Sequence, residues 1–351
     1  MDIIKRLAEY DHEQLVYFND VNTDIKGIIA IHNTYLGPSL GGCRMWNYTN
    51  EQEALNDVLR LSRAMTYKAA VAGLNLGGGK AVIIGDAKKQ KSMDLFQVFG
   101  RVVNSLGGRY ITAEDVGTNE KDMEVVYNET RYVTGIPKKL GGSGDPSPFT
   151  AYGVYMGMLA CVKEKLALSS MNGLKVLVQG AGNVGMHLID YLYNDEVELY
   201  VSDIDIDRCE YIKNKYNATI INPSDVFNVD VDIYAPCALG AVINEKSISQ
   251  LKCDIIAGAA NNQLFDENRD SELLSERNII YAPDFLINAG GLINVYSEIK
   301  GYDREHALNQ TKEIYNTTLE ILRKAEIDCV TTHNAALSIA QQRIVNKRRG
   351  L

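Results

Sequence analysis

A glycine-rich loop between a short apolar run and a helical pattern constrains the fold of this chain most strongly. The run Lys175–Gln179 (KVLVQ) leads into a G-x-G-x-x-G sequence made of Gly180, Ala181, Gly182, Asn183, Val184 and Gly185. In such a loop the first glycine makes a tight turn, the second lets a pyrophosphate approach the backbone, and the third lets the helix press on the strand. Because free N–H groups at a helix N-terminus bind phosphate, the pattern predicts a dinucleotide site.

An acidic residue stands where such a site needs one. The next apolar run, Glu198–Ser202, ends directly before Asp203, which lies 23 residues after Gly180. A carboxylate at this spacing accepts hydrogen bonds from the adenosine ribose hydroxyls, and it repels a 2′-phosphate. The sequence therefore favours NAD over NADP. The alternative interpretation is that Asp203, Asp205 and Asp207 form a solvated acidic loop.

Length and charge exclude several classes of protein. At a prior of about 150 residues per domain, 351 residues suggest two domains. A formal charge of −9 without a long basic run argues against a nucleic-acid partner. No apolar stretch is long enough to span a membrane or to form a signal peptide, and the six cysteines are scattered, so we expect a reduced, cytoplasmic protein. The five histidines show no zinc-ligand spacing, and we expect no metal.

The segment from Gly135 to Pro148 is the clearest domain boundary, because it holds three of the seven prolines and four glycines. Apolar runs that alternate with helical patterns follow it and predict a parallel sheet covered on both faces. The fold class is therefore α/β with two domains. Helices are expected over Glu51–Met65, Phe149–Leu168 and Asp303–Ile344, and strands over Ile25–His32, Ala81–Gly85, Arg109–Thr112, Lys175–Gln179, Glu198–Ser202, Ala218–Ile221, Val231–Tyr234, Asp254–Ala257 and Asn278–Tyr281.

Two lysines stand in apolar, glycine-rich surroundings. Lys68 follows Met65-Thr66-Tyr67, and Lys80 follows three consecutive glycines just before an expected strand. Lysine usually lies in water, so such settings favour one lysine that binds a carboxylate and another that takes part in proton transfer. Asp115 follows another expected strand. The alternatives are lysines that reach solvent from strand ends, and an aspartate that caps a turn.

Eight segments carry a family resemblance that runs nearly from end to end of the chain. They are Leu36–Met45, Met65–Lys68, Gly77–Lys80, Ile111–Gly117, Gly180–Gly185, Tyr234–Gly240 (YAPCALG), Ala257–Leu264 and Tyr281–Asn294. In this order they resemble the amino-acid dehydrogenase superfamily that includes the glutamate, leucine, phenylalanine and valine enzymes, and the leucine branch looks closest.

The resemblance implies a division of labour between two domains. Residues 1–135, with about 325–351 returning to them, would form a substrate-binding and oligomerisation domain, and residues 150–325 a Rossmann-type NAD-binding domain. Lys68 would hold the substrate carboxylate, Lys80 would activate water, and Asp115 would relay protons. The remaining site residues implied are Gly41, Gly42 and Met65 as walls of the substrate site, Thr150, Asn183, Cys237, Ala238 and Asn261 along the cofactor, and Asn288 near nicotinamide and substrate.

The implied reaction is reversible, NAD-dependent oxidative deamination of an amino acid to a 2-oxo acid, ammonia and NADH. Glutamate-specific relatives carry a lysine where this chain has Leu40, so a substrate carboxylate there would be buried without a partner. Leu40, Ala113, Leu292 and Val295 would instead line an aliphatic pocket, which favours leucine, valine or isoleucine. An aromatic amino-acid dehydrogenase and a non-catalytic NAD-binding sensor are the alternatives. We expect a homo-oligomer built from dimers, and the shorter C-terminus leaves the family's usual octamer open.

Overall fold

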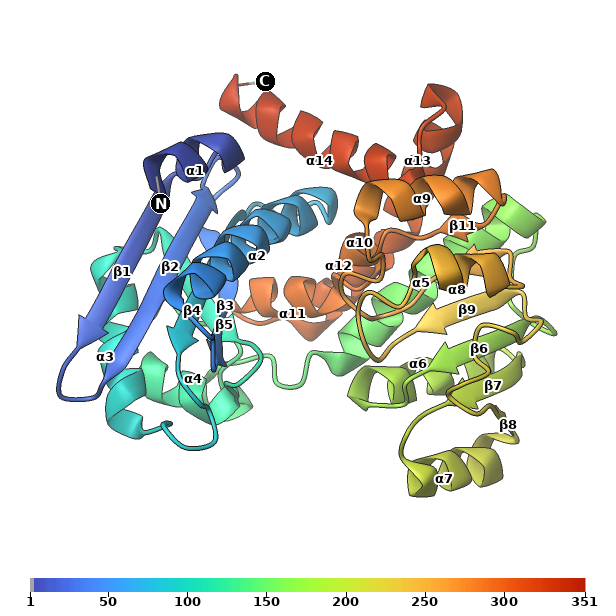
Figure 1. The fold of residues 1–351 in the computed structure, drawn as a ribbon, viewed down its shortest axis with the longest axis horizontal. Coiled ribbons are helices and arrows are strands. Elements are labelled where there is room, and N and C mark those ends of the chain that lie inside the picture. The colour runs from blue at the N-terminus through green and yellow to red at the C-terminus, as the bar shows by residue number, and fades with distance from the viewer. Residues whose placement is uncertain (1–2, 351) are drawn as a thin grey trace. The chain divides into compact units, whose positions relative to one another are not determined.

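The computed structural model describes residues 3–350 and divides the chain into two compact units. Unit 1 comprises the residues up to Asp145 together with Val295–Arg304 and the residues from Ala340 onward. Unit 2 comprises Pro146–Asn294 and Glu305–Ile339. Both units are α/β, so the predicted fold class is confirmed (Figure 1).

Unit 1 is built on a five-stranded sheet in the order β1-β2-β4-β3-β5. The pairs β1·β2 and β2·β4 are antiparallel, whereas β3 runs parallel to both β4 and β5. The strands are β1 (Gln14–Asp20), β2 (Ile25–Asn33), β3 (Ser39–Trp46), β4 (Gly77–Ile84) and β5 (Tyr110–Glu114), and the helices are α1 (Ile3–Tyr10), α2 (Glu51–Val71), α3 (Met93–Ser105), α4 (Glu120–Tyr127) and the short 3-10 helix Lys138–Leu140.

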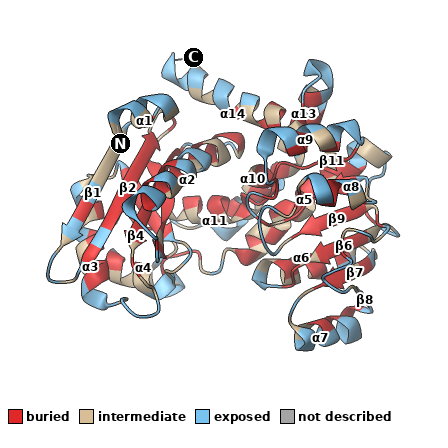
Figure 2. Ribbon diagram, viewed as in Figure 1, coloured by how far each residue is buried: buried red, intermediate tan, exposed pale blue. Residues whose placement is uncertain are grey.

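Each face of this sheet has its own apolar core. Helix α2 packs on the face that presents Ile28, Ala30 and Val82, and the opposite face buries Ile29 and Ala81 in a cluster with α3 and α4. Figure 2 shows β2 and β4 as buried strands, while β1 is only partly covered. Helix α2 therefore covers one face of the sheet, and α3 and α4 cover the other.

Three glycines start β4, which the sequence predicted to begin only at Ala81. Glycine has no side chain to pack and usually weakens a strand, so the prediction placed Lys80 before the strand rather than inside it. The structure gives the physical reason for one of these glycines, Gly78. A Cβ atom on Gly78 would lie 2.2 Å from the backbone nitrogen of Thr66, because α2 packs directly on the backbone of β4. The strand β3, which contains the pair Gly41-Gly42, was not predicted from the sequence for the same reason.

The C-terminal end of α2 is held by a residue from near the end of the chain. Arg343, on α14 (Thr332–Arg348), donates hydrogen bonds to the carbonyl oxygens of Ala70, Gly73 and Leu74 and to Oδ1 of Asn75, at 2.6–3.0 Å. Carbonyl groups at a helix end have no partner inside the helix. The guanidinium group of Arg343 supplies one.

Unit 2 is built on a six-stranded parallel sheet in the doubly wound order β11-β10-β9-β6-β7-β8, in which β7 and β8 are added on one side of β6 and β9, β10 and β11 on the other. The strands are β6 (Lys175–Gln179), β7 (Glu198–Ser202), β8 (Thr219–Ile220), β9 (Ile233–Pro236), β10 (Ile255–Ile256) and β11 (Ile280–Tyr281). The helices are α5 (Ser147–Leu166), α6 (Asn183–Asn194), α7 (Ile206–Tyr216), α8 (Glu245–Gln250), α9 (Glu267–Glu276), α10 (Asp284–Ile287), α12 (Arg304–Lys312) and α13 (Ile314–Asp328).

The last third of the chain differs from the expectation. A return to the first domain was expected from about residue 325, but residues 325–339 group with unit 2, and Val295–Arg304, including part of α11 (Gly290–Glu298), groups with unit 1. The reason is that α13 packs along α5, where Gly153 and Gly157 provide space beside Ile314 and Thr318. None of the helices in residues 3–350 has the length and apolarity needed to cross a membrane.

Candidate active site

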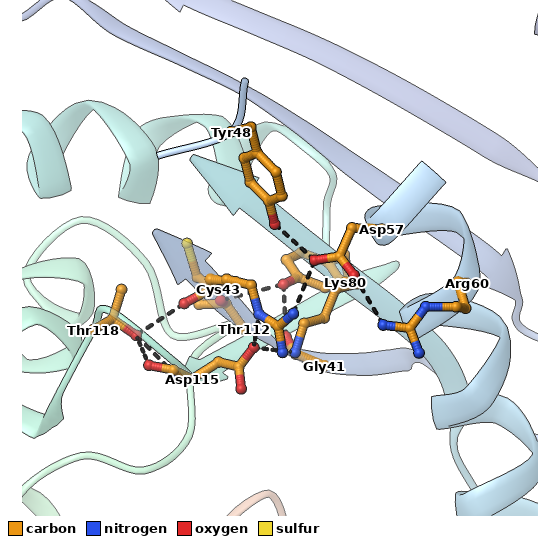
Figure 3. Close-up of polar contacts among 11 residues, drawn as sticks. Gly41, Cys43, Tyr48, Asp57, Arg60, Lys80, Thr112, Asp115 and Thr118 are labelled. Atoms are coloured by element: carbon orange, nitrogen blue, oxygen red, sulfur yellow. Dashed lines mark hydrogen bonds and ion pairs between the residues drawn. The ribbon is translucent and has the colours of Figure 1, made fainter. Parts of the chain in front are cut away.

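A buried ion pair joins Lys80 and Asp115 inside unit 1. Lys80 lies in β4 and is only 5% exposed, and its Nζ atom is 2.5 Å from Oδ2 of Asp115, the residue that follows β5 (Figure 3). The backbone N–H of Asp115 donates to Oγ1 of Thr118 at 2.9 Å, and that hydroxyl donates to the carbonyl oxygen of Cys43 at 2.8 Å. The loop after β5 is thus fixed against β3, and it holds the carboxylate beside the lysine.

A second cation, Arg44 of β3, contacts the same carboxylate. Its Nε atom donates to Oδ2 of Asp115 at 3.2 Å, and its Nη1 atom donates to Oδ2 of Asp57, on α2, at 2.8 Å. Asp57 also accepts hydrogen bonds from the hydroxyl of Tyr48 at 2.7 Å and from Arg60 at 3.0 Å (Figure 3). The sequence reasoning missed Arg44, Tyr48 and Asp57.

These cations decide the ionisation of Asp115. Burial of the carboxylate by itself raises the pKa of Asp115, but the positive charges of Lys80 and Arg44 outweigh that effect and hold this pKa below its usual value. Asp115 is therefore a carboxylate at neutral pH, able to accept a proton from a group that comes close to it.

Several of the predicted substrate residues share a sheet face with Lys80. Gly78 faces α2, and side chains alternate along a strand, so Lys80 faces α2 as well. In the parallel register Leu40 of β3 pairs with Gly78, and Gly42 pairs with Ala113 of β5. Leu40, Gly42 and Ala113 therefore lie on the face of Lys80, with Leu40 only 2% exposed.

Gly41, unlike Gly42, is fixed by contacts with Tyr110 and with the backbone of β4. Its carbonyl oxygen accepts a hydrogen bond from the buried Tyr110 hydroxyl at 2.6 Å, and a Cβ atom on Gly41 would lie 1.7 Å from the carbonyl oxygen of Gly79. Gly41 thus allows β3 and β4 to approach closely.

The other two predicted residues of unit 1 lie on α2. Met65 and Lys68 follow Asp57 by 8 and 11 residues, a spacing that puts all three on one side of a helix of 3.6 residues per turn. All three are half-buried. Asp57 contacts Arg44 of β3. Lys68 therefore lies on the same side of α2 as the residue that contacts β3.

The glycine loop of unit 2 has the predicted form. Gly180 adopts φ +100°, a conformation that side chains rarely allow, and a Cβ atom on Gly185 would lie 2.1 Å from the carbonyl oxygen of Gly180. In contrast, a Cβ atom on Gly182 would meet no described atom within 4 Å. Gly182 is the N-cap of α6 and provides no side-chain cap, so α6 begins with uncapped N–H groups beside the open space at Gly182.

Asp203 and two residues after β9 surround this loop. One carboxylate oxygen of Asp203, Oδ2, accepts the backbone N–H of Ala181 at 2.6 Å, and the other accepts that of Asp205 at 2.9 Å. Ala238 lies directly against Gly180, and the backbone N–H of Cys237 donates to the carbonyl oxygen of Gln179 at 2.7 Å. The structure therefore brings the loop, Asp203, Cys237 and Ala238 together at the carboxyl ends of β6, β7 and β9, the edge where doubly wound sheets bind nucleotides.

Asn288 and Asn261 form a second predicted group in unit 2. The side-chain amide of Asn288 donates to Oδ1 of Asn261 at 2.8 Å and to the carbonyl oxygen of Ala259 at 3.2 Å. Thr150 lies near the start of α5, where a Cβ atom on Gly291 would come within 2.8 Å of its hydroxyl. Leu292 is buried in unit 2, and Val295 is the first residue of the segment that belongs to unit 1.

The open glycine loop on a doubly wound sheet is typical of a nucleotide-binding enzyme, and the buried lysine–carboxylate pair provides groups suited to proton transfer. Comparison with known proteins narrows this class. Residues 12–132 match the model of the Glu/Leu/Phe/Val dehydrogenase dimerisation domain, and residues 198–349 match that of the Glutamate/Leucine/Phenylalanine/Valine dehydrogenase domain.

Two relatives align over nearly the whole chain. A leucine dehydrogenase from Geobacillus stearothermophilus is 49% identical, covering 99% of this chain and 95% of the relative, and an L-tryptophan dehydrogenase from Nostoc punctiforme is 46% identical, covering 99% and 98%. The crystal structure of L-tryptophan dehydrogenase from Nostoc punctiforme superposes with a TM-score of 0.89 at 45% identity, covering 99% of both chains. The chain belongs to the Glu/Leu/Phe/Val dehydrogenase family, whose members are amino-acid dehydrogenases that use a nicotinamide cofactor.

Proposed function

We propose that this enzyme catalyses the reversible, NAD-dependent oxidative deamination of branched-chain L-amino acids, with leucine as a good substrate. The observation that carries the proposal is the Lys80–Asp115 pair on a sheet face that also presents the apolar Leu40 and Ala113. This reaction requires, among other things, charged groups that exchange protons and an apolar surface that accepts an aliphatic side chain. The identity of 49% to a leucine dehydrogenase supports the same substrate class.

The proposed roles follow from the chemistry of each side chain. Lys68 binds the substrate α-carboxylate as a compact cation, and Met65 and Gly42 border the substrate. When bound, an oxidised nicotinamide would accept the hydride that leaves the substrate Cα. Lys80 then orients and activates the water that adds to the resulting imine, and the ionised Asp115 takes up a proton from the amino group or from that water. The carbinolamine releases ammonia and leaves the 2-oxo acid.

The loop of unit 2 is proposed to hold NAD rather than NADP. The open space at Gly182 and the N–H groups of α6 fit a pyrophosphate, and Thr150, Cys237, Ala238, Asn261 and Asn288 extend the site toward the nicotinamide. Asp203 supports the choice of NAD, because a carboxylate beside the loop accepts from ribose hydroxyls and repels a 2′-phosphate.

Replacing Asp203 with Asn is expected to lower the preference for NAD over NADP by about 10- to 100-fold, because hydrogen bonds to charged groups contribute ~1.5–3 kcal/mol. The measurement is the ratio of kcat/KM for the two cofactors. Asp207→Asn is the matched control, since Asp207 is an exposed residue in the first turn of α7. An unchanged ratio in the Asp203 variant would contradict the role of Asp203.

A panel of amino acids tests the reaction itself. We expect NADH formation with leucine, valine and isoleucine, and little with glutamate, phenylalanine or tryptophan. A preference for phenylalanine or tryptophan would instead support an aromatic amino-acid dehydrogenase, the alternative that the L-tryptophan dehydrogenase relative favours. NAD binding without turnover of any of the six would support a sensor.

We also propose that the chain assembles into a dimer-based homo-oligomer in the cytoplasm, without nucleic-acid partners. The match of residues 12–132 to a dimerisation domain supports the assembly. In this proposal residues 1–135, with about 325–351, serve substrate binding and oligomerisation, and residues 150–325 bind NAD. Light scattering of the purified enzyme gives the number of subunits, and a monomer at micromolar concentration would contradict the proposal.

A further inference from the structure

We propose that Arg44 is the positioning residue of Asp115, and that Asp57 and Tyr48 fix Arg44 for this purpose. The inference rests on the proposed function, because it concerns how Asp115 is held and ionised for proton transfer. Nothing in the match to the family assigns a role to these three residues. The juxtaposition that carries the inference is one guanidinium group held between two carboxylates from different elements.

Different nitrogen atoms of the Arg44 guanidinium group bind the two carboxylates. Nε of Arg44 donates to Oδ2 of Asp115 at 3.2 Å, and Nη1 donates to Oδ2 of Asp57 at 2.8 Å. Lys80 approaches the same Oδ2 atom of Asp115 at 2.5 Å. Two cations from neighbouring strands thus fix the direction of the carboxylate, and a lysine in place of Arg44 would lack the planar fork that reaches both acids.

Asp57 is itself held firmly, which makes it an anchor rather than a competing acceptor. The Tyr48 hydroxyl donates to Oδ2 of Asp57 at 2.7 Å, and Arg60 donates to Oδ1 at 3.0 Å. These hydrogen bonds and the charge of Arg44 keep the pKa of Asp57 low even though burial raises it. Figure 3 shows Tyr48 and Arg60 approaching Asp57 from different sides.

The anchor also couples two proposed roles. Asp57 and Lys68 lie on one side of α2, and Arg44 links Asp57 to Asp115. The helix that carries the carboxylate-binding lysine is thereby connected through one guanidinium group to the proton acceptor. A shift of α2 would move both, so the network fixes the substrate carboxylate and the proton acceptor in one frame.

Replacing Arg44 with a shorter side chain is not expected to leave an empty cavity inside the protein. Together with Trp46, Tyr48 and Val116, it lines an open cavity of about 500 Å³ within unit 1, and its side chain is 22% exposed. Water can therefore fill the space left by a shorter side chain, so Arg44→Gln is expected to fold.

The charged and titratable groups around Asp115 are Lys80 from β4, Arg44 and Cys43 from β3, Tyr110 from β5 and Tyr48 after β3, with Asp57 of α2 behind Arg44. Cys43, Tyr110 and Tyr48 stay neutral near pH 7, because burial raises the pKa of each. Removal of Arg44 therefore takes away one of two cations that lower the pKa of Asp115, and that pKa rises. The acidic limb of the kcat/KM profile then moves to higher pH, since the reaction needs the carboxylate.

The test compares Arg44→Gln, Arg44→Lys and Asp57→Asn with the unchanged enzyme. Each is expected to lower kcat for leucine about 10- to 100-fold, since small misplacements of a reacting group have effects of this size. Arg44→Gln moves the acidic limb upward. Asp57→Asn leaves the cation beside Asp115 in place and does not move the limb upward. NAD affinity is expected to stay unchanged in all three. Arg101→Gln, which removes an exposed arginine paired with Glu129, is the control without effect.

A second readout does not depend on turnover. Carbon-13 NMR of the aspartate side chains, with the Asp115 signal identified by its loss in Asp115→Asn, is expected to show a raised Asp115 pKa in Arg44→Gln. An unshifted pKa, or a folded Arg44→Gln enzyme with unchanged kcat, overturns the inference. If the unchanged enzyme turns over none of the amino acids, the proposed function fails, while the NMR titration still decides whether Arg44 controls the ionisation of Asp115.

Discussion

Replacing Lys80 with Met is expected to lower kcat/KM for leucine by roughly 1,000-fold or more, since positioned acid–base groups contribute ~10²–10⁴-fold. Methionine keeps most of the length of lysine and removes only the charge and the proton donor. Because Lys80 also lowers the pKa of Asp115, the substitution weakens the proton acceptor as well. Steady-state kinetics with NAD measure the loss, and equilibrium titration with NADH is expected to show unchanged cofactor binding, since the loop proposed to bind the cofactor belongs to unit 2.

Lys91→Met is the matched control for this prediction. Lys91 is also a partly buried lysine of unit 1 paired with an aspartate, Asp122, but it stands outside the candidate site. The control is expected to lose some stability and to keep turnover within a few-fold. Equal losses of kcat/KM in the two variants would assign the effect of Lys80 to folding rather than to chemistry.

Replacing Leu40 with Lys is expected to lower kcat/KM for leucine by at least about 100-fold, because a buried ammonium group without a partner costs several kcal/mol. Leu40 is only 2% exposed and shares the sheet face of Lys80. Glutamate brings a carboxylate that can pair with the new charge, so its kcat/KM is expected to rise relative to that of leucine. The measurement is the leucine-to-glutamate ratio of kcat/KM.

Leu40→Met separates the charge from the change of shape. Methionine has nearly the length of lysine without its charge, and volume-conserving apolar changes are tolerated best. This control is expected to keep the preference for leucine. Thermal unfolding adds a check without turnover, since a ligand that binds the folded state raises Tm. If glutamate raises Tm no more in Leu40→Lys than in Leu40→Met, Leu40 does not face the substrate side chain.

The fold could be predicted best where one local signal decided it. The strands β6 and β7 have the predicted bounds, because apolar runs that end at a glycine loop or an acidic turn allow few alternatives. Helix α2 was predicted to end at Met65 but continues to Val71, and its last turn is buried at Ala69, Ala70 and Val71. The strand β3 was missed because its Gly-Gly pair has low strand propensity, and only the neighbouring strands make it favourable.

Some residues of the candidate site could be predicted from the sequence, and others could not. Lys80 and Asp115 could be proposed from sequence because each is a charged residue in an apolar setting. Arg44 and Asp57 could not, since the contact between Arg44 and Asp115 joins positions 71 residues apart and depends on the parallel register of β3 and β5. The one available signal was a charge two residues after Gly42, on the same face of an unrecognised strand.

The hold of Arg343 on the end of α2 has a consequence for biosynthesis. Domains generally fold as units while the ribosome moves along the message, and the N-terminal part folds first. Here the carbonyl groups of Ala70, Gly73 and Leu74 accept hydrogen bonds from a side chain that is made about 270 residues later. The end of α2 therefore reaches its final form only after Arg343 has been made, and a premature stop codon before Arg343 leaves the end of the helix that carries Lys68 without these hydrogen bonds.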